Sequence, residues 1–121
     1  MFSKYGFNHK IDDLLLRVSY SGTITNREMK EIMERIYSLI RDNFIEKVLI
    51  DARKSDVLLE FRESLDFASN HPPEFQRVKT AVVENKEKEA QFKLYEMFVK
   101  NRDLNLSFFT NMEDAEQWLK N

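Results

Sequence analysis

Polar side chains follow three of the apolar segments of this 121-residue chain, at the points where the segments end. Asp51, Asn85 and Thr110 occupy these places. In open α/β sheets ligands bind beyond the carboxyl ends of the strands, so the three residues form a candidate ligand rim. The same residue types also end strands and cap helices, and a rim that binds no ligand is the alternative interpretation.

Asp51 ends a central apolar segment, which is the place of the phosphoacceptor in response-regulator receiver domains. That chemistry also needs an acidic pair after the first parallel strand and a lysine after a later strand. The chain has Ser21-Gly22 and Thr110-Asn111 at those places, and Asp12-Asp13 precedes its strand. The pattern therefore favours a structural role for Asp51, in organising the loop that follows it.

Histidine and cysteine are too scarce for the catalytic sets that can be recognised in a sequence. The chain has two histidines, His9 and His71, and no cysteine. His71 stands before Pro72-Pro73, where a helix must end, and His9 is expected to be an exposed strand residue. No nucleophilic triad, metal-ligand spacing or glycine-rich phosphate loop is present. We expect no enzyme activity, no cofactor and no metal site.

Composition restricts the class of protein and its partners. The chain is 42% apolar and 33% charged, with 19 basic and 21 acidic residues and a net charge of −2. This balance gives no basic footprint for nucleic acid. The longest apolar runs have about three residues, so we expect neither a signal peptide nor a membrane span, and a cytoplasmic location. Glycine and proline are scarce and no linker interrupts the chain, which predicts a single domain over residues 1–121.

The N-terminal third predicts a hairpin and a helix. Apolar residues alternate from Leu14 to Tyr20, as in a strand with one buried face, and Gly22 is expected to end that strand. Residues Lys4 to His9 are its predicted hairpin partner, with Asp12-Asp13 near the turn. Thr25 and Glu28 form a capping box for a helix to about Asn43. Its buried stripe is Met29, Ile32, Met33, Ile36 and Ile40, and its expected surface ion pairs are Glu31–Arg35 and Lys30–Glu34.

The rest of the chain alternates between strands and helices. The predicted elements are a buried strand at Val48–Ile50, a helix at Leu58–Asn70, a strand at Val78–Glu84, a helix at Glu87–Arg102, a strand over Leu104, Leu106 and Phe108, and a last helix capped by Thr110 and Glu113. This order predicts an α/β fold with a mostly parallel sheet of four to five strands, an N-terminal antiparallel hairpin strand and about four helices.

Three segments resemble one known family. They are Lys47-Val48-Leu49-Ile50-Asp51-Ala52-Arg53, the strand Val78-Lys79-Thr80-Ala81-Val82-Val83, and the ending from Phe108-Phe109-Thr110-Asn111 to Glu113-Asp114-Ala115-Glu116-Gln117-Trp118-Leu119. In this order they resemble the SpoIIAA-like, or STAS-like, proteins over nearly the whole chain. The resemblance implies a βα superhelix that acts as a non-catalytic regulatory module by binding another protein.

In the anti-sigma factor antagonists of that group, a kinase phosphorylates a serine in an Asp-Ser-Ser-Gly-like motif at the start of the second helix. The corresponding stretch here, Leu59-Glu60-Phe61-Arg62, lacks both the serine and the glycine. We expect no regulatory phosphorylation at Ser64, where Glu60 and Glu63 would repel a phosphate. At Ser55, Arg53 and Lys54 would attract a phosphate, whereas Asp56, which follows directly, opposes it. The partner-binding surface is expected on this helix and the loop before it, with contributions from Arg53, Ser55, Asp56, Leu59, Phe61, Arg62 and Phe67.

Two further predictions concern ligands and assembly. The aromatic side chains of the third long helix, over about Glu87–Arg102, suggest an alternative function as a carrier of a small ligand or lipid. Its pocket would lie at the carboxyl ends of the strands, beside Asp51, Asn85 and Thr110. A homodimer is expected if the N-terminal hairpin leaves an unpaired sheet edge.

Overall fold

The computed structural model describes residues 5–121, without the side chain of Phe61. The described strands are β1 (Tyr5–Asp12), β2 (Leu15–Thr25), β3 (Lys47–Leu58), β4 (Lys79–Val83) and β5 (Leu106–Phe109). The described α-helices are α1 (Asn26–Asn43), α2 (Phe61–Ser69), α3 (Pro73–Arg77), α4 (Glu89–Lys100) and α5 (Met112–Lys120), and a short 3-10 helix, η1 (Lys86–Lys88), precedes α4.

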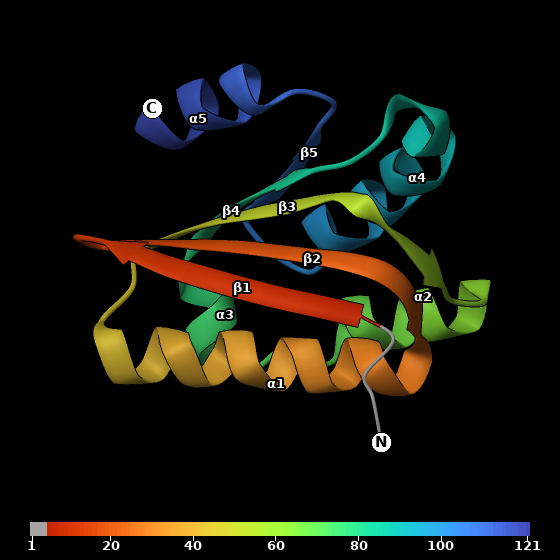
Figure 1. Cartoon of the computed structure of the whole chain (residues 1–121), viewed down its shortest axis with the longest axis horizontal. Coiled ribbons are helices and arrows are strands. Elements are labelled where there is room, and N and C mark those ends of the chain that lie inside the picture. Colours follow the sequence, from red (N-terminus) through yellow and green to blue (C-terminus); the bar gives the residue numbers. More distant parts are fainter. Residues whose placement is uncertain (1–4) are drawn as a thin grey trace.

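The five strands form one sheet in the order β1-β2-β3-β4-β5. β1 is antiparallel to β2, and each of the other neighbouring pairs is parallel. Helices α1, α2 and α3 lie on one side of the sheet and α5 lies on the other (Figure 1). This arrangement confirms the predicted α/β class, the mostly parallel sheet and the antiparallel first strand.

β1 and β2 form the predicted hairpin. The 8 residues of β1 all pair with β2, from Tyr5 with Gly22 to Asp12 with Leu15. The turn between the strands has only two residues, and Asp13 takes a left-handed conformation with a φ of 58°. Aspartate is one of the few residues that adopt this conformation readily, which explains its place in the turn. Lys4, the first residue of the predicted segment, lies outside the described residues.

β2 does not end at Gly22, so that prediction is wrong. The strand continues to Thr25, and Gly22 pairs with Ser55 of β3 on its other side. Gly22 has a φ of 90°, a backbone angle that residues with a Cβ atom rarely adopt. The glycine therefore lets the strand continue through an unusual backbone conformation.

Helix α1 begins at the predicted capping box. The Thr25 hydroxyl accepts a hydrogen bond from the Glu28 amide at 3.3 Å, and the Thr25 amide donates to Glu28 Oε1 at 3.0 Å. The predicted surface pairs are wrong: among the described residues Glu31 instead contacts Arg27 at 4.0 Å, and the Arg35 guanidinium lies 4.1 Å from the centre of the Phe7 ring. The buried residues of the helix are Met29, Ile32, Ile36, Tyr37 and Ile40.

β3 is the central strand, and it is buried from both faces as predicted. Val48 and Ile50 pack into the larger core cluster, which also contains residues of α1, α3 and α4. Leu49 points to the opposite face and packs with Ala115 and Leu119 of α5. β3 therefore contributes side chains to both cores. Burying an aliphatic side chain of this size stabilises the fold by roughly 1.5–3 kcal/mol.

The second predicted helix begins too early in the sequence. Leu58 is the last residue of β3, and α2 starts three residues later at Phe61. The His71-Pro72-Pro73 sequence ends α2 as expected, but Pro73 also begins a short helix, α3, that the prediction omitted. Proline is favoured in the first turn of a helix because its fixed φ fits and its missing amide hydrogen has no partner there.

The predicted capping box of the last helix is also wrong. Asn111, not Thr110, is the N-cap of α5, and its Oδ1 accepts a hydrogen bond from the Asp114 amide at 2.8 Å. Asparagine and threonine are both favourable N-cap residues, so the sequence alone does not show which of the two neighbours caps the helix. The long predicted helix before β5 is divided into η1 and α4, and its aromatic face is packed against β5, where Phe92 stacks on Phe108 with 5.1 Å between the ring centres.

His71 connects α1 to α3 inside the protein. Its side chain is only 8% exposed, its Nδ1 lies 2.7 Å from the Tyr37 hydroxyl, and its ring stacks on Phe75 at 4.6 Å. The sequence predicts the helix-ending role of this residue but not its buried contact. Burial lowers the pKa of His71 to about 4, so the imidazole is neutral in the folded protein at neutral pH.

We expect the Thr25→Ala variant to lower the free energy of unfolding by about 1 kcal/mol, because the α1 N-terminus loses its side-chain acceptor. Urea titration followed by circular dichroism measures the change. Thr23→Ala is the matched control, since Thr23 is exposed in β2 and caps no helix. Equal stability of the two variants would contradict the role of the cap.

The stability of the protein should fall as the pH is lowered from about 6.5 to about 4. In this range the unfolded chain protonates His71 while the folded protein keeps it neutral. A His71→Phe variant should lose this contribution, which is about 3 kcal/mol at most. Urea titrations at several pH values give the slope. His9→Phe is the control, because His9 is exposed on β1, and parallel curves for wild type and His71→Phe would refute the assignment.

Candidate functional site

The end of β3 extends beyond the strand that lies next to it. β3 pairs with β4 only from Lys47 to Asp51, whereas it pairs with β2 as far as Leu58. We call residues 52–58 the β3 overhang. On the β4 side, two side chains replace the missing backbone ladder: Asn85 Nδ2 donates to the Arg53 carbonyl at 2.6 Å, and Lys88 Nζ donates to the Ser55 carbonyl at 2.8 Å. These two bonds fix the overhang and the start of α2 beyond it.

Asp51 and Arg53 pair with each other where the overhang begins. Arg53 makes a bidentate contact with the Asp51 carboxylate, with two distances of 2.9 Å, and its backbone amide donates to the same carboxylate at 3.1 Å. The side-chain hydrogen bond from Arg53 lowers the pKa of Asp51, although partial burial opposes this. The pairing register with β2 shifts between Ser19 and Ser21, so this segment contains a bulge. The prediction of a loop after Asp51 is wrong, because β3 continues to Leu58, and Asp51 pairs with Arg53 inside this strand.

Ser55 and Asp56 differ in accessibility although they are neighbours. Ser55 is only 5% exposed, and its hydroxyl donates to the Ala52 carbonyl at 2.7 Å. Asp56 is exposed and lies 3.7 Å from Lys88 Nζ. The Ser55 hydroxyl therefore points into the protein and is not available to a partner or a kinase in this conformation.

Glu84 is a buried carboxylate at the end of β4. It is 9% exposed, and its Oε1 accepts a hydrogen bond from the Asn85 amide at 3.2 Å. Burial raises the pKa of Glu84; Lys88 and the Asn85 amide oppose this rise, while Asp51 and Asp56 add to it. Lys88 thus compensates part of the acidic charge here while it holds the overhang.

The start of α2 exposes apolar and basic side chains together. Leu58, the last residue of β3, is 54% exposed, and Arg62 in the first turn of α2 is also exposed. Leu59 and Phe67 are half-buried against the larger core, so they offer only part of their surface. Glu60 is the N-cap residue, and its amide donates to Glu63 Oε1 at 2.9 Å. The side chain of Phe61 lies outside the described residues.

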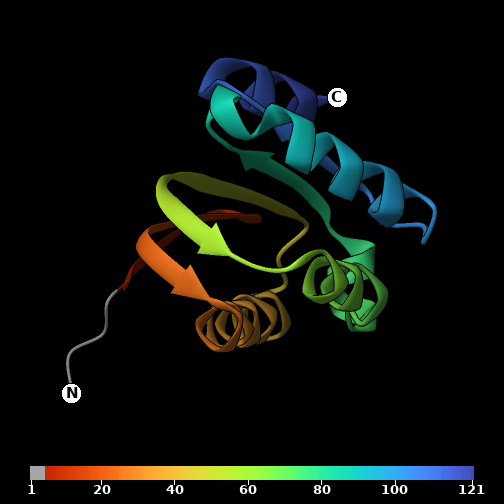
Figure 2. The same ribbon diagram turned by 90° about the vertical axis from the view of Figure 1, so that its right-hand side faces the viewer.

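A groove of about 450 Å³ separates α1 from α2, which lie side by side (Figure 2). Met33, Tyr37 and Phe67 supply its apolar surface, and the remaining lining is polar or charged: Asn26, Lys30, Glu34, Glu63, Asp66 and Asn70. Of the sequence-predicted partner residues, only Phe67 belongs to this lining. The groove lies next to the surface at the start of α2, and its charged side chains are three carboxylates and Lys30.

The predicted rim residues follow the ends of three neighbouring strands, because Asp51 pairs with Val83 and Val83 pairs with Phe109, but they do not share one pocket. Asp51 lines a shallow hollow of about 190 Å³ over β1, β2 and β3, together with Lys10 and Arg17. Asn85 is occupied by the Arg53 carbonyl, and Thr110 is exposed in the bend before α5. Neither Asn85 nor Thr110 lines this hollow or the groove between α1 and α2. The predicted pocket at the strand ends stays a prediction.

Two residues of this region were missed by sequence reasoning. The sequence placed Leu58 at the start of one predicted helix and Lys88 at the start of a longer one. Leu58 follows Val57 in an apolar stretch that suits a strand end or a helix start equally well, so its exposure has no sequence signal. Lys88 acts through a contact 33 residues away along the chain, which no local pattern contains.

Within residues 5–121, no group of three or more acidic, histidine or cysteine side chains is arranged to hold a metal ion. In the same residues, no helix is both long enough and apolar enough to cross a bilayer.

The geometry is that of a βα superhelix with an antiparallel first strand. The chain belongs to the SpoIIAA-like family, which matches residues 15–120, and the predicted resemblance is confirmed. No curated protein matches the sequence.

Two solved structures share the fold. One is an anti-sigma factor antagonist from Mycobacterium paratuberculosis, with a TM-score of 0.63 and 13% identity over 97% of this chain and 95% of that chain. The other is an uncharacterized protein with a SpoIIAA-like fold from Shewanella loihica, with a TM-score of 0.61 and 20% identity over 98% of each chain. At these identities the similarity establishes the fold.

We expect Lys88→Met to free the Ser55 carbonyl and loosen the β3 overhang. Amide hydrogen exchange in residues 53–58 should become about tenfold faster, because local opening loses one hydrogen bond to a charged donor. Mass spectrometry of peptic fragments measures this exchange. Lys86→Met is the matched control, since Lys86 is exposed and forms no ion pair among the described residues. Unchanged exchange in Lys88→Met would show that the overhang does not depend on this bond.

Proposed function

We propose that this protein is a non-catalytic regulatory module that binds another protein through the start of α2 and the β3 overhang. The proposed contact surface contains Arg53, Asp56, Leu58, Leu59, Phe61, Arg62 and Phe67. Ser55, part of the sequence-based prediction, is left out because its side chain is buried.

The observation that carries the proposal is the exposure of both Leu58 and Arg62 where β3 leads into α2. An apolar side chain that is 54% exposed gains free energy when a partner covers it. None of the described carboxylates forms an ion pair with Arg62, so its guanidinium is available to an acidic group. Apolar contacts and arginine are both enriched where proteins bind one another. The fold shared with an anti-sigma factor antagonist adds support, since that protein acts on a regulatory protein by its printed name.

Partner binding in this proposal does not depend on phosphorylation. The helix N-terminus, where the family resemblance implies a phosphoacceptor, has Glu60 as its N-cap residue. A carboxylate near a helix N-terminus is favoured by the helix dipole, so negative charge is permanently present there. We infer that binding is not controlled by phosphorylation at the start of α2.

A ligand-carrier function is less well supported. The groove between α1 and α2 has a volume suited to a small molecule, but six of its nine lining residues are polar or charged, which does not suit a lipid chain. The aromatic residues that motivated this alternative are packed in the core, where Tyr95 contacts Phe108 at 5.8 Å. A bound small molecule in native mass spectra of freshly purified protein would favour the carrier over the binding module.

The test of the partner surface uses a Leu58→Ser/Arg62→Glu variant, quantified by affinity purification and mass spectrometry from the native cells. We expect at least one partner captured by the wild type to be lost about tenfold or more, because burial of an apolar side chain and a charge contact are both removed. The matched control is Leu94→Ser/Lys93→Glu, the same chemical changes at exposed positions of α4. Equal recovery of every partner by wild type and Leu58→Ser/Arg62→Glu would refute the surface.

A further inference from the structure

β1 is the outermost strand at one edge of the sheet (Figure 1). Its inner side is fully paired with β2, from Tyr5 to Asp12. In an antiparallel pair, the N–H and C=O groups of alternate residues point toward the neighbouring strand, and those of the residues between them point away. Every second residue of β1 therefore presents its backbone groups outward.

The hairpin geometry shows which residues these are. A two-residue turn is closed by a hydrogen-bonded pair, here Asp12 with Leu15, so the even-numbered residues of β1 bond to β2. The other side of β2 agrees with this parity, because the Leu14 carbonyl accepts hydrogen bonds from the Glu46 and Lys47 amides beside β3. Phe7, His9 and Ile11 therefore direct their amides and carbonyls away from the sheet.

This edge carries two charged side chains, Lys10 and Asp12, but it lacks two other features that commonly protect an edge strand. β1 contains no proline, and its register with β2 is continuous, without a bulge. Within residues 5–121, no other element pairs with its outer side. The opposite edge differs, because β5 has only 4 residues and its Phe108 amide donates to Glu96 Oε2 of α4 at 2.7 Å. Of the two edges that the sheet has within residues 5–121, only the β1 edge is open to pairing with another strand.

We propose that two copies of this chain pair through β1, antiparallel and about a twofold axis, to form one ten-stranded sheet. The twofold operation matches outward donors with outward acceptors, because both strands offer the same alternating pattern. The covered β5 edge prevents further addition, so pairing stops at the dimer. This proposal is independent of the partner surface at α2.

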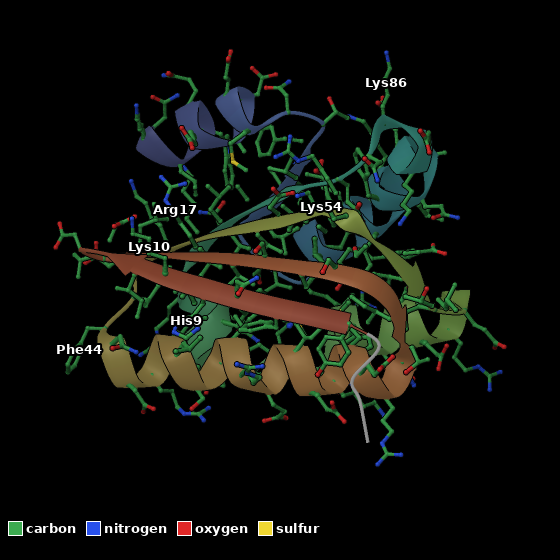
Figure 3. All side chains as sticks on the ribbon, viewed as in Figure 1. His9, Lys10, Arg17, Phe44, Lys54 and Lys86 are labelled. Carbon is green, nitrogen blue, oxygen red and sulfur yellow. The ribbon has the colours of Figure 1, made fainter. Side chains whose placement is uncertain are left out.

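Side-chain chemistry permits this pairing in two registers, with the axis at Asn8 or at His9. In the first, Phe7 lies opposite His9 of the second copy; in the second, Phe7 lies opposite Ile11. Phe7 and Ile11 are half-buried in the single chain, and either register covers them further. Lys10 meets Gly6 or Asn8 in these registers, so no like charges are opposed. His9 lies on the α1 side of the sheet, and Lys10 and Arg17 lie on the other (Figure 3).

Sedimentation of the full chain over a range of concentrations tests the dimer, compared with His9→Pro. Proline at this position removes an outward amide hydrogen and no bond within the hairpin. We expect the dimer dissociation constant to rise about tenfold or more, because each dimer loses the hydrogen bond from this amide twice. His9→Ala, which keeps the amide, should dimerise like the wild type. A wild type that remains monomeric at every concentration overturns the proposal, as does a His9→Pro variant that folds and dimerises equally well.

Single-cysteine variants give a second, independent test, because the chain contains no cysteine. Under mild oxidation we expect Asn8→Cys or His9→Cys to form a disulfide-linked dimer, since one of these positions faces itself across the axis. Lys10→Cys is the matched control: it lies on the same strand and is as exposed as Asn8, but it is too far from its counterpart to be bridged. Cross-linking at Lys10→Cys as fast as at both other positions, or at none of the three, would refute the pairing.

Discussion

The whole fold depends on burying β3 from both of its faces. The segment of a strand that is covered on both faces must be apolar, and Val48, Leu49 and Ile50 of β3 meet this requirement with exposures of 4% or less. Because successive side chains point to opposite faces, the same three residues require one layer of helices on each side. The helices α1 and α5 are the consequence, and the parallel neighbours β2 and β4 follow from the crossovers that bring those helices into place.

The same strand determines where the protein can present a surface. β3 is longer than β4, so its last residues have no neighbouring strand on the β4 side before the chain leads into α2. The core holds the first half of β3 rigidly, whereas the second half is held by β2 and by the side chains of Asn85 and Lys88. The exposed residues at the start of α2 are therefore carried by an element that is fixed to the core and still reaches solvent.

Sequence periodicity predicted the order of the elements and the composition of the core because both depend on local alternation. The capping box at Thr25 and the both-face burial of β3 are examples, since each is encoded within a few neighbouring residues. The errors occur where tertiary contacts decide. Gly22 was expected to end a strand, but pairing with β1 and β3 on both sides keeps it within β2. The start of α2 was misplaced because β2 extends the pairing of β3 to Leu58.

The way the β3 overhang is held has a consequence for the divergence of related proteins. Its inner support is backbone pairing, which almost any sequence can supply, but its outer support comes from two side chains in the segment between β4 and α4. Substitutions at positions 85 and 88 leave the hydrophobic core untouched. Such substitutions would change how firmly the β3 overhang is held, and one at Lys88 would also remove the cation that compensates the buried Glu84.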